Sequence, residues 1–356
     1  MSTGEKSTNS TLLQRNKSLS LKRVLVIGGG FCGLIAAKHL EKQFSVTLID
    51  PKDYFEYTPS ILKYLSGPHE RLRIPYKETL SNSRILKGRA SYENGKVTLK
   101  KNIPFDYLIL ATGFRPFLPI SGTYCYDGAS SASIHAAKEQ VKKAKSILII
   151  GGGYIGVELA AEIATHYPEK KLTIIHGASR LLERNIPGVS RYAASFFKNR
   201  NVSIIYDDLV LSVKGKTYMT REGKKITADI AFICAGTLPN TSAIQHPCLD
   251  ERKRVKVNKH LQVENEKNIF AGGDITNIQE EKTAQNAEAH GKIIAKNIIR
   301  LEKRQELLSY KPSPKAMIIS LGDKNGIFTY KRFWIGGLVP GYIKHFVEMR
   351  VLRANR

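Results

Sequence analysis

The chain has 356 residues, 42% of them hydrophobic, and its 56 Lys and Arg against 31 Asp and Glu give a formal net charge of +25. This length accommodates two nucleotide-binding domains and a short extra module, and without a run of about 18 apolar residues no membrane-spanning helix is predicted. The excess of cations favours an anionic partner, namely a membrane surface, nucleic acid or phosphorylated cofactors. A basic surface without a partner is the alternative.

Residues 1–21 are rich in Ser and Thr and contain no apolar h-region. We interpret them as a disordered tail or a weak transit peptide and not as a secretory signal. Ser2 follows Met1, so the N-myristoylation pattern is absent. Four cysteines are scattered without C-x-x-C or C-x4-C spacing, which predicts neither a redox dithiol nor a metal cluster and suits a reducing compartment: Cys32, Cys125, Cys234 and Cys248.

The first βαβ unit begins with the apolar run RVLVI, followed by Gly28, Gly30 and Gly33. The first glycine permits a tight turn, the second lets backbone approach a pyrophosphate, and the third lets the helix pack on the strand. The next strand, SVTLID, ends on Asp50, about 20 positions after the glycines, where a carboxylate accepts bonds from an adenosine ribose. This combination predicts a dinucleotide site.

The second βαβ unit repeats the pattern at Gly151, Gly153 and Gly156. His176 stands where a ribose-binding acid is expected, and Arg180 follows closely. Without a carboxylate at this place, and with a cation nearby, we expect NADPH to be accepted beside NADH. A strand-end histidine with structural partners is the alternative for His176. Two such units in one chain predict an α/β fold with two Rossmann-like domains.

Glu158 lies near the start of the helix that follows the second glycine turn. A functional interpretation places its carboxylate near the nicotinamide or the flavin edge. Stabilisation of the helix dipole is the alternative. Further elements are predicted, in chain order, as a meander around the turn Asn94-Gly95, apolar strands within 105–114, 228–240 and 269–276, and a long helix over 283–304.

The C-terminal segment is expected to form a separate module with a strand at KAMIISLG and an amphipathic tail. An apolar run precedes Pro340, and on a helix from Gly341 one broad face carries Tyr342, Ile343, Phe346, Val347 and Met349. Cations flank this face at Lys344, His345, Arg353 and Arg356. Such a segment is predicted to lie in a membrane interface. Docking onto the body of the protein or onto a dimer partner is the alternative.

Five separated motifs, GGGFCG, ATGFRP, GGGYIGVELAAE, CAGTLPN and AGGDI, resemble the FAD-dependent pyridine nucleotide–disulfide oxidoreductase superfamily over roughly residues 22–300. FEYTPSIL and the tail resemble its apoptosis-inducing-factor-like branch, which includes ferroptosis suppressor protein and is close to type II NADH dehydrogenases. The resemblance implies a discontinuous FAD domain with an inserted NAD(P)H domain. We expect these boundaries: FAD domain 22–118 and 240–305, NAD(P)H domain 119–239, C-terminal module 306–356.

The resemblance also implies roles for single residues. Asp274 would bind the ribityl–phosphate region of FAD. Thr112 and Gly113 would pass close to the flavin, and Thr58 and Pro59 would lie beside its isoalloxazine. Gly236 would lie beside the nicotinamide nucleotide, and Ala284 and Gln285 would lie by a quinone. For the last two an ordinary capped helix start is the alternative. Glu158 and Gln285 are the candidate catalytic residues, for positioning or proton handling.

The disulfide reductases carry a C-x4-C pair in the first helix, whereas this chain has only Cys32 there. The branch that it resembles implies hydride transfer from NAD(P)H to flavin N5 and then two electrons to a quinone at a membrane, on a cytoplasmic face or in mitochondria. A nucleic-acid-binding flavoprotein and a reductase of a small acidic electron carrier are the alternatives. No helix-turn-helix, zinc or RNP-like signature favours the former. The oligomeric state, a dimer included, is left open.

Overall fold

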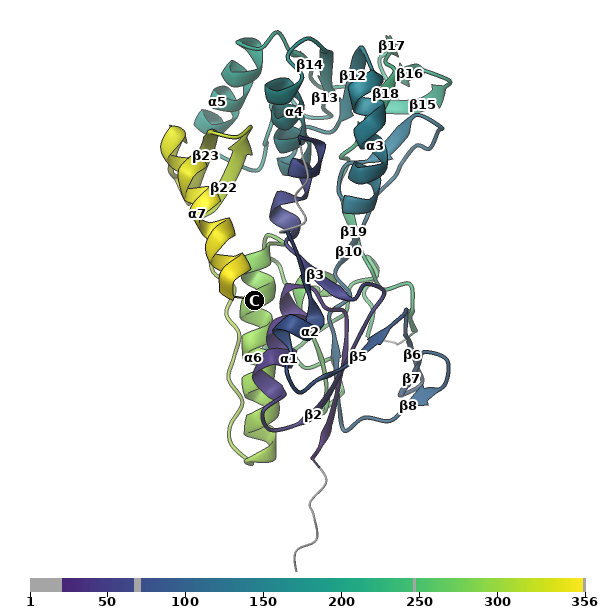
Figure 1. Ribbon diagram of the computed structural model, residues 1–356, viewed down its shortest axis with the longest axis vertical. Coiled ribbons are helices and arrows are strands. Elements are labelled where there is room, and N and C mark those ends of the chain that lie inside the picture. Colours follow the sequence, from purple (N-terminus) through teal and green to yellow (C-terminus); the bar gives the residue numbers. More distant parts are fainter. Residues whose placement is uncertain (1–20, 67–71, 246–247, 355–356) are drawn as a thin grey trace, which may run out of the picture.

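The computed structural model describes residues 21–66, 72–245 and 248–354, so the expectations for residues 1–20 and for Arg356 lie outside the described residues. Figure 1 shows two lobes stacked along the long axis, with the C-terminal segment against the side of both. Each lobe is built on a five-stranded parallel sheet. The predicted α/β fold with two Rossmann-like units is confirmed.

The sheet of the first lobe has the order β21-β9-β1-β2-β5, with every pair parallel. Its central strand, β1, is buried after its first residue because helices and a meander cover both faces. The strands are β1 (Arg23–Ile27), β2 (Ser45–Asp50), β5 (Arg84–Lys87), β9 (Tyr107–Leu110) and β21 (Ile269–Ala271). Strand β21 therefore brings the chain back to the first lobe.

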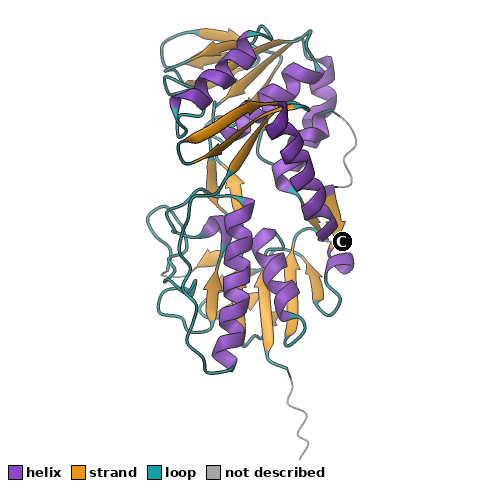
Figure 2. Ribbon diagram, turned by 90° about the vertical axis from the view of Figure 1, so that its left-hand side faces the viewer, coloured by secondary structure: helices purple, strands orange, loops and turns teal. Residues whose placement is uncertain are grey.

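Helices α1 (Phe31–Leu40) and α6 (Ala284–Glu302) lie side by side in the first lobe (Figure 2). Around them stand β3 (Tyr54–Glu56), the 3-10 helix η1 (Thr58–Leu65), β4 (Arg73–Pro75), α2 (Tyr76–Thr79) and the 3-10 helix η3 (Gly273–Ile275). The predicted meander is present, and its Asn94-Gly95 turn has positive φ at both residues, 48° and 74°. It consists of β6 (Ser91–Glu93), β7 (Lys96–Thr98) and β8 (Asn102–Ile103), with β20 (Ile244–Gln245) added at its edge.

The sheet of the second lobe repeats this design in the order β11-β18-β12-β13-β14. Its strands are β11 (Cys125–Asp127), β12 (Ser146–Ile150), β13 (Lys171–Ile175), β14 (Ser203–Ile205) and β18 (Ile230–Ile233). Helices α3 (Ser131–Lys143), α4 (Tyr154–His166) and α5 (Pro187–Lys198) cover it. An antiparallel sheet at the far edge contains β15 (Val210–Lys214), β16 (Thr217–Thr220) and β17 (Lys225–Thr227).

A two-stranded antiparallel ribbon joins the lobes. It pairs β10 (Phe114–Pro116) with β19 (Thr237–Pro239), one leading into the second lobe and the other leading out. Thr112 Oγ1 donates a hydrogen bond to the Asn240 carbonyl at 2.6 Å, and Asn240 Nδ2 donates to the Thr112 carbonyl at 3.2 Å. The two crossing points are thus held together as one connection.

The C-terminal module is an antiparallel sheet of β22 (Met317–Leu321), β23 (Asn325–Tyr330) and β24 (Phe333–Gly337), followed by α7 (Leu338–Ala354). The helix starts three residues before the predicted Gly341. Pro340 is tolerated there because the first turn of a helix needs no donor from its N–H. The module contacts α4 and α5 in one lobe and reaches α1 in the other, where Lys38 donates to the Ala354 carbonyl at 2.9 Å.

Helix α7 docks through Lys344, Glu348 and the buried Leu352, while most of its large apolar residues face outward. Lys344 Nζ donates to Glu158 Oε1 at 2.6 Å, and Glu348 Oε2 accepts from Ser60 Oγ at 2.7 Å and from Lys63 Nζ at 2.6 Å. The Glu348 side chain is 1% exposed. Exposed residues on this helix and the strand before it are mostly large and apolar: Phe333, Ile335, Leu338, Val339, Tyr342, Ile343, Phe346, Val347 and Met349.

Two residues of this segment, Lys344 and Trp334, point toward the protein. Lys344 was expected as a cation beside a membrane, but its side chain is 14% exposed and pairs with Glu158. Trp334 packs on α5, where its ring lies 5.9 Å from the Tyr192 ring and against Gly188. Both residues fasten the module to the second lobe instead of facing solvent.

The turn between β22 and β23 is a further point of attachment. His166 Nε2 lies 3.1 Å from Asp323 Oδ1 and 3.3 Å from Glu162 Oε1, so one imidazole joins α4 to the module. Gly322, at φ 73°, packs so closely on Thr165 that a Cβ would collide with its hydroxyl. Tail docking therefore combines close packing with polar contacts.

Replacing Glu348 with Ala should loosen α7 selectively, because Lys63 and Ser60 lose a shared buried acceptor. Since Lys63 is partly exposed, we expect a loss of about 2 kcal/mol, below the range for a fully buried pair. Hydrogen–deuterium exchange of the α7 amides should accelerate about 30-fold. Glu222→Ala, at a carboxylate that is 54% exposed, is the control and should change nothing. Unaltered α7 exchange in Glu348→Ala would show that this contact does not hold the helix.

Candidate functional site

Both glycine turns have the geometry that a bound pyrophosphate requires. Gly28 and Gly151 have φ of 103° and 113°, and a Cβ on either would strike a carbonyl of the neighbouring strand end. A Cβ on Gly33 or Gly156 would strike the carbonyl of the first glycine of its own turn. Each turn thus needs glycine for conformation and for close packing of helix on strand.

The second glycine of each turn leaves open space in front of two helix ends. Apart from its chain neighbours, no atom of the described residues lies within 4 Å of a Cβ built on Gly30 or Gly153, the N-caps of α1 and α4. Neither helix has a side-chain cap or an acid in its first turn, so its first N–H groups and positive dipole end are offered to an anion. Both sites fit the phosphates of a dinucleotide.

Asp50 fixes the first turn from the end of β2. Its Oδ2 accepts from the Gly29 N–H at 2.7 Å and its Oδ1 from the Lys52 N–H at 2.8 Å. Tyr76 adds a bond from its hydroxyl to the Gly29 carbonyl at 3.0 Å. The carboxylate therefore stands beside the glycine turn, at the position predicted for ribose recognition.

His176 takes the corresponding place in the second unit. Its Nδ1 accepts from the Gly152 N–H at 3.0 Å, and its Nε2 lies 3.0 Å from Glu183 Oε2. The expectation that no carboxylate stands near this strand end is wrong, because the chain folds back and supplies Glu183. Arg180 donates to the Glu183 carbonyl at 2.7 Å, so the expected cation belongs to the same turn.

The predicted flavin and nicotinamide positions Thr112, Gly113 and Gly236 lie at the ribbon between the lobes. Gly113 and Gly236 have φ of 70° and 112°, and no atom lies within 4 Å of a Cβ on either. The Gly236 carbonyl accepts from the Phe117 N–H at 3.0 Å. Open space thus lies before both glycines, where the two lobes meet.

Asp274 lies in η3 at the N-terminal side of α6. Burial raises the pKa of its carboxyl to about 6, while Lys282 acts in the opposite direction and Glu280 in the same one. The preceding Gly273 N–H donates to His290 Nδ1 at 2.9 Å, and His290 Nε2 lies 2.9 Å from Glu280 Oε1. A buried histidine thus holds this loop as His176 holds the second glycine turn.

The two candidate catalytic residues are joined to one segment of the C-terminal module. Glu158 Oε1 accepts from the Ser320 N–H at 2.7 Å, and Gln285 Nε2 donates to the Ala316 carbonyl at 3.1 Å. Four residues of extended chain separate these contacts, about 13 Å. Ala284 is the first residue of α6, after the N-cap Thr283. The module therefore brings the start of α4 and the start of α6 to the same strand.

Thr58 and Pro59, predicted beside the isoalloxazine, begin η1. The adjoining Tyr57 is buried, and burial raises the pKa of its hydroxyl, with the carboxylates of Glu348, Glu158 and Glu288 acting in the same direction. The 3-10 helix η1 thus contacts α4 and, through Ser60 and Lys63, α7. Thr58 and Pro59 therefore lie on an element that packs against the helix of the candidate Glu158.

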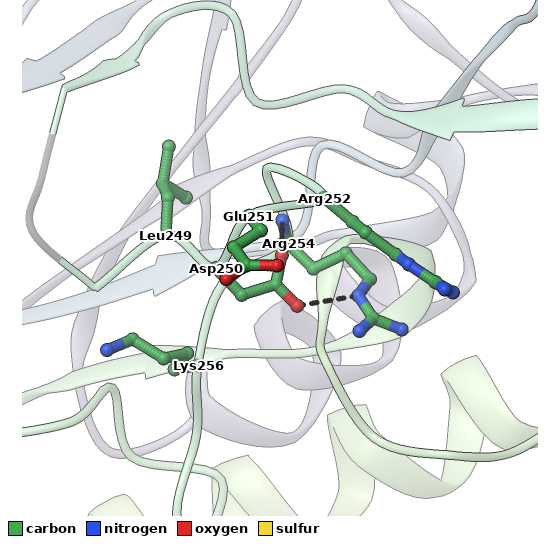
Figure 3. A pocket seen from close by; sticks show the side chains of 6 residues that line it. All are labelled: Leu249, Asp250, Glu251, Arg252, Arg254 and Lys256. Carbon is green, nitrogen blue, oxygen red and sulfur yellow. Dashed lines mark hydrogen bonds and ion pairs between the residues drawn. The ribbon is translucent and has the colours of Figure 1, made fainter.

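A shallow cavity of about 400 Å³ lies elsewhere, on the segment before η3 (Figure 3). Arg254 Nε donates to Asp250 Oδ2 at 2.8 Å across it. Its lining residues belong to neither glycine turn, so it is not the dinucleotide site: Leu249, Asp250, Glu251, Arg252, Arg254 and Lys256.

Comparison with protein families matches residues 22–291 to the pyridine nucleotide-disulphide oxidoreductase family. The chain belongs to this family. Apoptosis-inducing factor homolog A of Dictyostelium discoideum is 33% identical, over 86% of this chain and 84% of the relative. Human ferroptosis suppressor protein 1 is 30% identical, over 89% of this chain and 90% of the relative. The predicted resemblance is confirmed.

Solved structures agree on the fold. The sulfide:quinone oxidoreductase of Aquifex aeolicus superposes with a TM-score of 0.84 at 20% identity, covering 94% of this chain and 91% of that one. NDH2 of Plasmodium falciparum, solved with NADH, gives 0.81 at 17% identity, covering 93% and 94%. The family assignment makes the chain a pyridine nucleotide oxidoreductase, and both glycine turns fit the pyrophosphates of FAD and NAD(P)H.

Sequence reasoning missed three residues that the structure adds to the site: Glu183, Lys63 and Glu348. Glu183 escaped because only the residues next to the strand end were searched for an acid. Glu348 stands four positions after Lys344 on the expected helix, and this polar i, i+4 pair within an apolar segment was the available signal.

Purified protein should carry about one FAD per chain, and Asp50→Ala should lower FAD retention at least tenfold. The Asp50 carboxylate accepts from the Gly29 N–H and is also predicted to accept from the ribose, so the substitution removes both interactions. Flavin absorbance after dialysis measures the effect, and Asp53→Ala, at a 63% exposed carboxylate nearby, is the control. FAD retention by Asp50→Ala equal to that of the unaltered chain would contradict the role given to this residue.

Proposed function

We propose that the chain is an NAD(P)H:quinone oxidoreductase that works at a membrane surface. The observation that carries this proposal is the exposed apolar face of β24 and α7, on a helix whose Lys344 and Glu348 bond to the protein. A soluble surface rarely gathers so many large apolar side chains on one element unless they meet a partner. No helix within the described ranges is both long and apolar enough to cross a bilayer.

An anionic membrane suits this face. Exposed cations, among them Lys331, Arg332, Arg350 and Arg353, flank the apolar side chains, and the whole chain carries a net charge of +25. Each Lys or Arg near an anionic surface contributes about 1 kcal/mol of attraction. Apolar insertion and cation attraction together are typical of an interfacial segment.

The acceptor is proposed from the position of the site. The module that would meet lipid also contacts Glu158 and Gln285, so the membrane surface would lie close to both candidate catalytic residues. The name of the sulfide:quinone oxidoreductase, which shares this fold, supports the same class of acceptor. A quinone acceptor also suits this chain because its first helix carries Cys32 without a second cysteine at C-x4-C spacing, so electrons cannot leave through a disulfide there.

When bound, FAD takes up a hydride equivalent and releases two electrons. The residues of this chain hold the cofactors, orient them and shield them from water. The glycine turns bind the two pyrophosphates, and Asp50 and Asp274 orient the first nucleotide. A quinone also needs protons, and Glu158, with Lys344 Nζ 2.6 Å away, is the candidate residue for handling them.

Exchanging Tyr342 and Phe346 together for Ser should detach the protein from membranes without unfolding it, because both rings are more than 60% exposed. With about 1.5 kcal/mol for each ring, binding to anionic vesicles should weaken more than 100-fold. Reduction of a long-chain quinone in those vesicles should fall in parallel. Reduction of a water-soluble quinone should be retained.

Leu211→Ser is the matched control, since this side chain is 60% exposed on β15 of the second lobe. It should leave vesicle binding unchanged. Unchanged vesicle binding by the double variant would refute the membrane-facing role of α7. Reduction of an acidic carrier protein in preference to any quinone would refute the acceptor.

A further inference from the structure

The two glycine turns are fixed by different chemical groups. In the first lobe a carboxylate, Asp50, accepts from the Gly29 N–H at 2.7 Å. In the second lobe an imidazole, His176, accepts from the Gly152 N–H at 3.0 Å. Gly29 and Gly152 are the middle glycines of equivalent turns, so His176 occupies the position of the ribose-binding acid without being one.

The hydrogen bonds of His176 determine what stands beyond it. Because Nδ1 accepts from an N–H, it carries no proton, and the neutral ring must carry its proton on Nε2. This Nε2–H donates to Glu183 Oε2, 3.0 Å away. The histidine therefore connects the glycine turn to a carboxylate that is displaced outward by the width of a ring.

Glu183 remains accessible while it is held in place. Its side chain is 41% exposed, whereas that of His176 is 11% exposed. Its backbone is fixed as well, because its carbonyl accepts from Arg180 at 2.7 Å. A further acid, Asp207, is exposed on the adjoining strand end, where its N–H donates to the Ala178 carbonyl at 3.3 Å.

We propose that Glu183 accepts the adenosine-ribose hydroxyls of the nicotinamide nucleotide and that this site selects NADH over NADPH. The carboxylate offers two acceptor oxygens to a diol and repels a 2′-phosphate. The cations nearby, Arg180 and Arg221, favour the phosphate. Each donates to a backbone carbonyl, that of Glu183 and that of Asp207, whereas the Glu183 carboxylate itself is accessible to the ribose. The proposal rests on the family assignment and is independent of the electron acceptor.

The test measures nucleotide selection in the full-length holoenzyme. Steady-state kcat/KM is determined for NADH and NADPH with a water-soluble quinone in the unaltered chain, Glu183→Gln and Arg180→Ala. Calorimetry with ADP-ribose and 2′-phospho-ADP-ribose measures the same selection without electron transfer. Glu169→Gln is the matched control, because that glutamate is 66% exposed and precedes the opposite end of β13.

The unaltered chain should prefer NADH at least tenfold, which corresponds to about 1.4 kcal/mol. Glu183→Gln should reduce this preference about tenfold, mainly through KM, and should raise the affinity for 2′-phospho-ADP-ribose. Glu169→Gln should change neither ratio. Equal use of both nucleotides by the unaltered chain, or a selectivity that Glu183→Gln leaves intact, would overturn the proposal. A selective loss of NADPH use in Arg180→Ala would assign the site to the 2′-phosphate instead.

Inactivity with every quinone would refute the proposed acceptor but leave the calorimetric comparison interpretable. The two proposals therefore fail separately. His176→Asn tests the positioning residue, since an amide can accept from Gly152 but does not reach Glu183. It should lower NADH selectivity as Glu183→Gln does, with little effect on kcat. Selectivity equal to that of the unaltered chain would contradict the connection through the imidazole.

Discussion

The structure depends on acceptors that hold the N–H groups of glycine loops. Glycine has no side chain to fix its own conformation, so each loop that would face a cofactor needs a bond from outside. Asp50 holds Gly29, His176 holds Gly152 and His290 holds Gly273. Both histidines face a glutamate through the other ring nitrogen. The helix starts, and with them the phosphate-binding N–H groups, are positioned by these few contacts.

Helix α7 departs from the usual rule for surface helices. Polar contacts at Lys344 and Glu348 help to hold it on the protein beside the buried Leu352, and most of its large apolar side chains are left outside. Charged pairs are suited to fixing the position of the helix because their energy depends on geometry. An apolar interface would specify one docked position less sharply. The same contacts make Glu158 part of the attachment, so tail docking and the arrangement of the site are one property.

Much of the fold was predictable because glycine turns, buried strands and the Asn94-Gly95 turn are local signals. The two parallel sheets follow from repeated βαβ units, whose handedness and pairing are restricted. The direction of the apolar arc of α7 could be predicted only with docking onto the protein as an alternative, because the arc is compatible with facing inward or outward and the partners of Lys344 and Glu348 decide. The role of Glu183 was not predictable, because its distance from the strand end in sequence hides its contact with His176.

The ribbon of β10 and β19 has a consequence for how such a chain arises. The second lobe leaves and re-enters the first through strands that are direct neighbours, about 5 Å apart. A whole nucleotide-binding lobe can therefore be inserted at this single point without rerouting the chain of the first lobe. The two lobes keep equivalent glycine turns but fix them by different acceptors, Asp50 and His176.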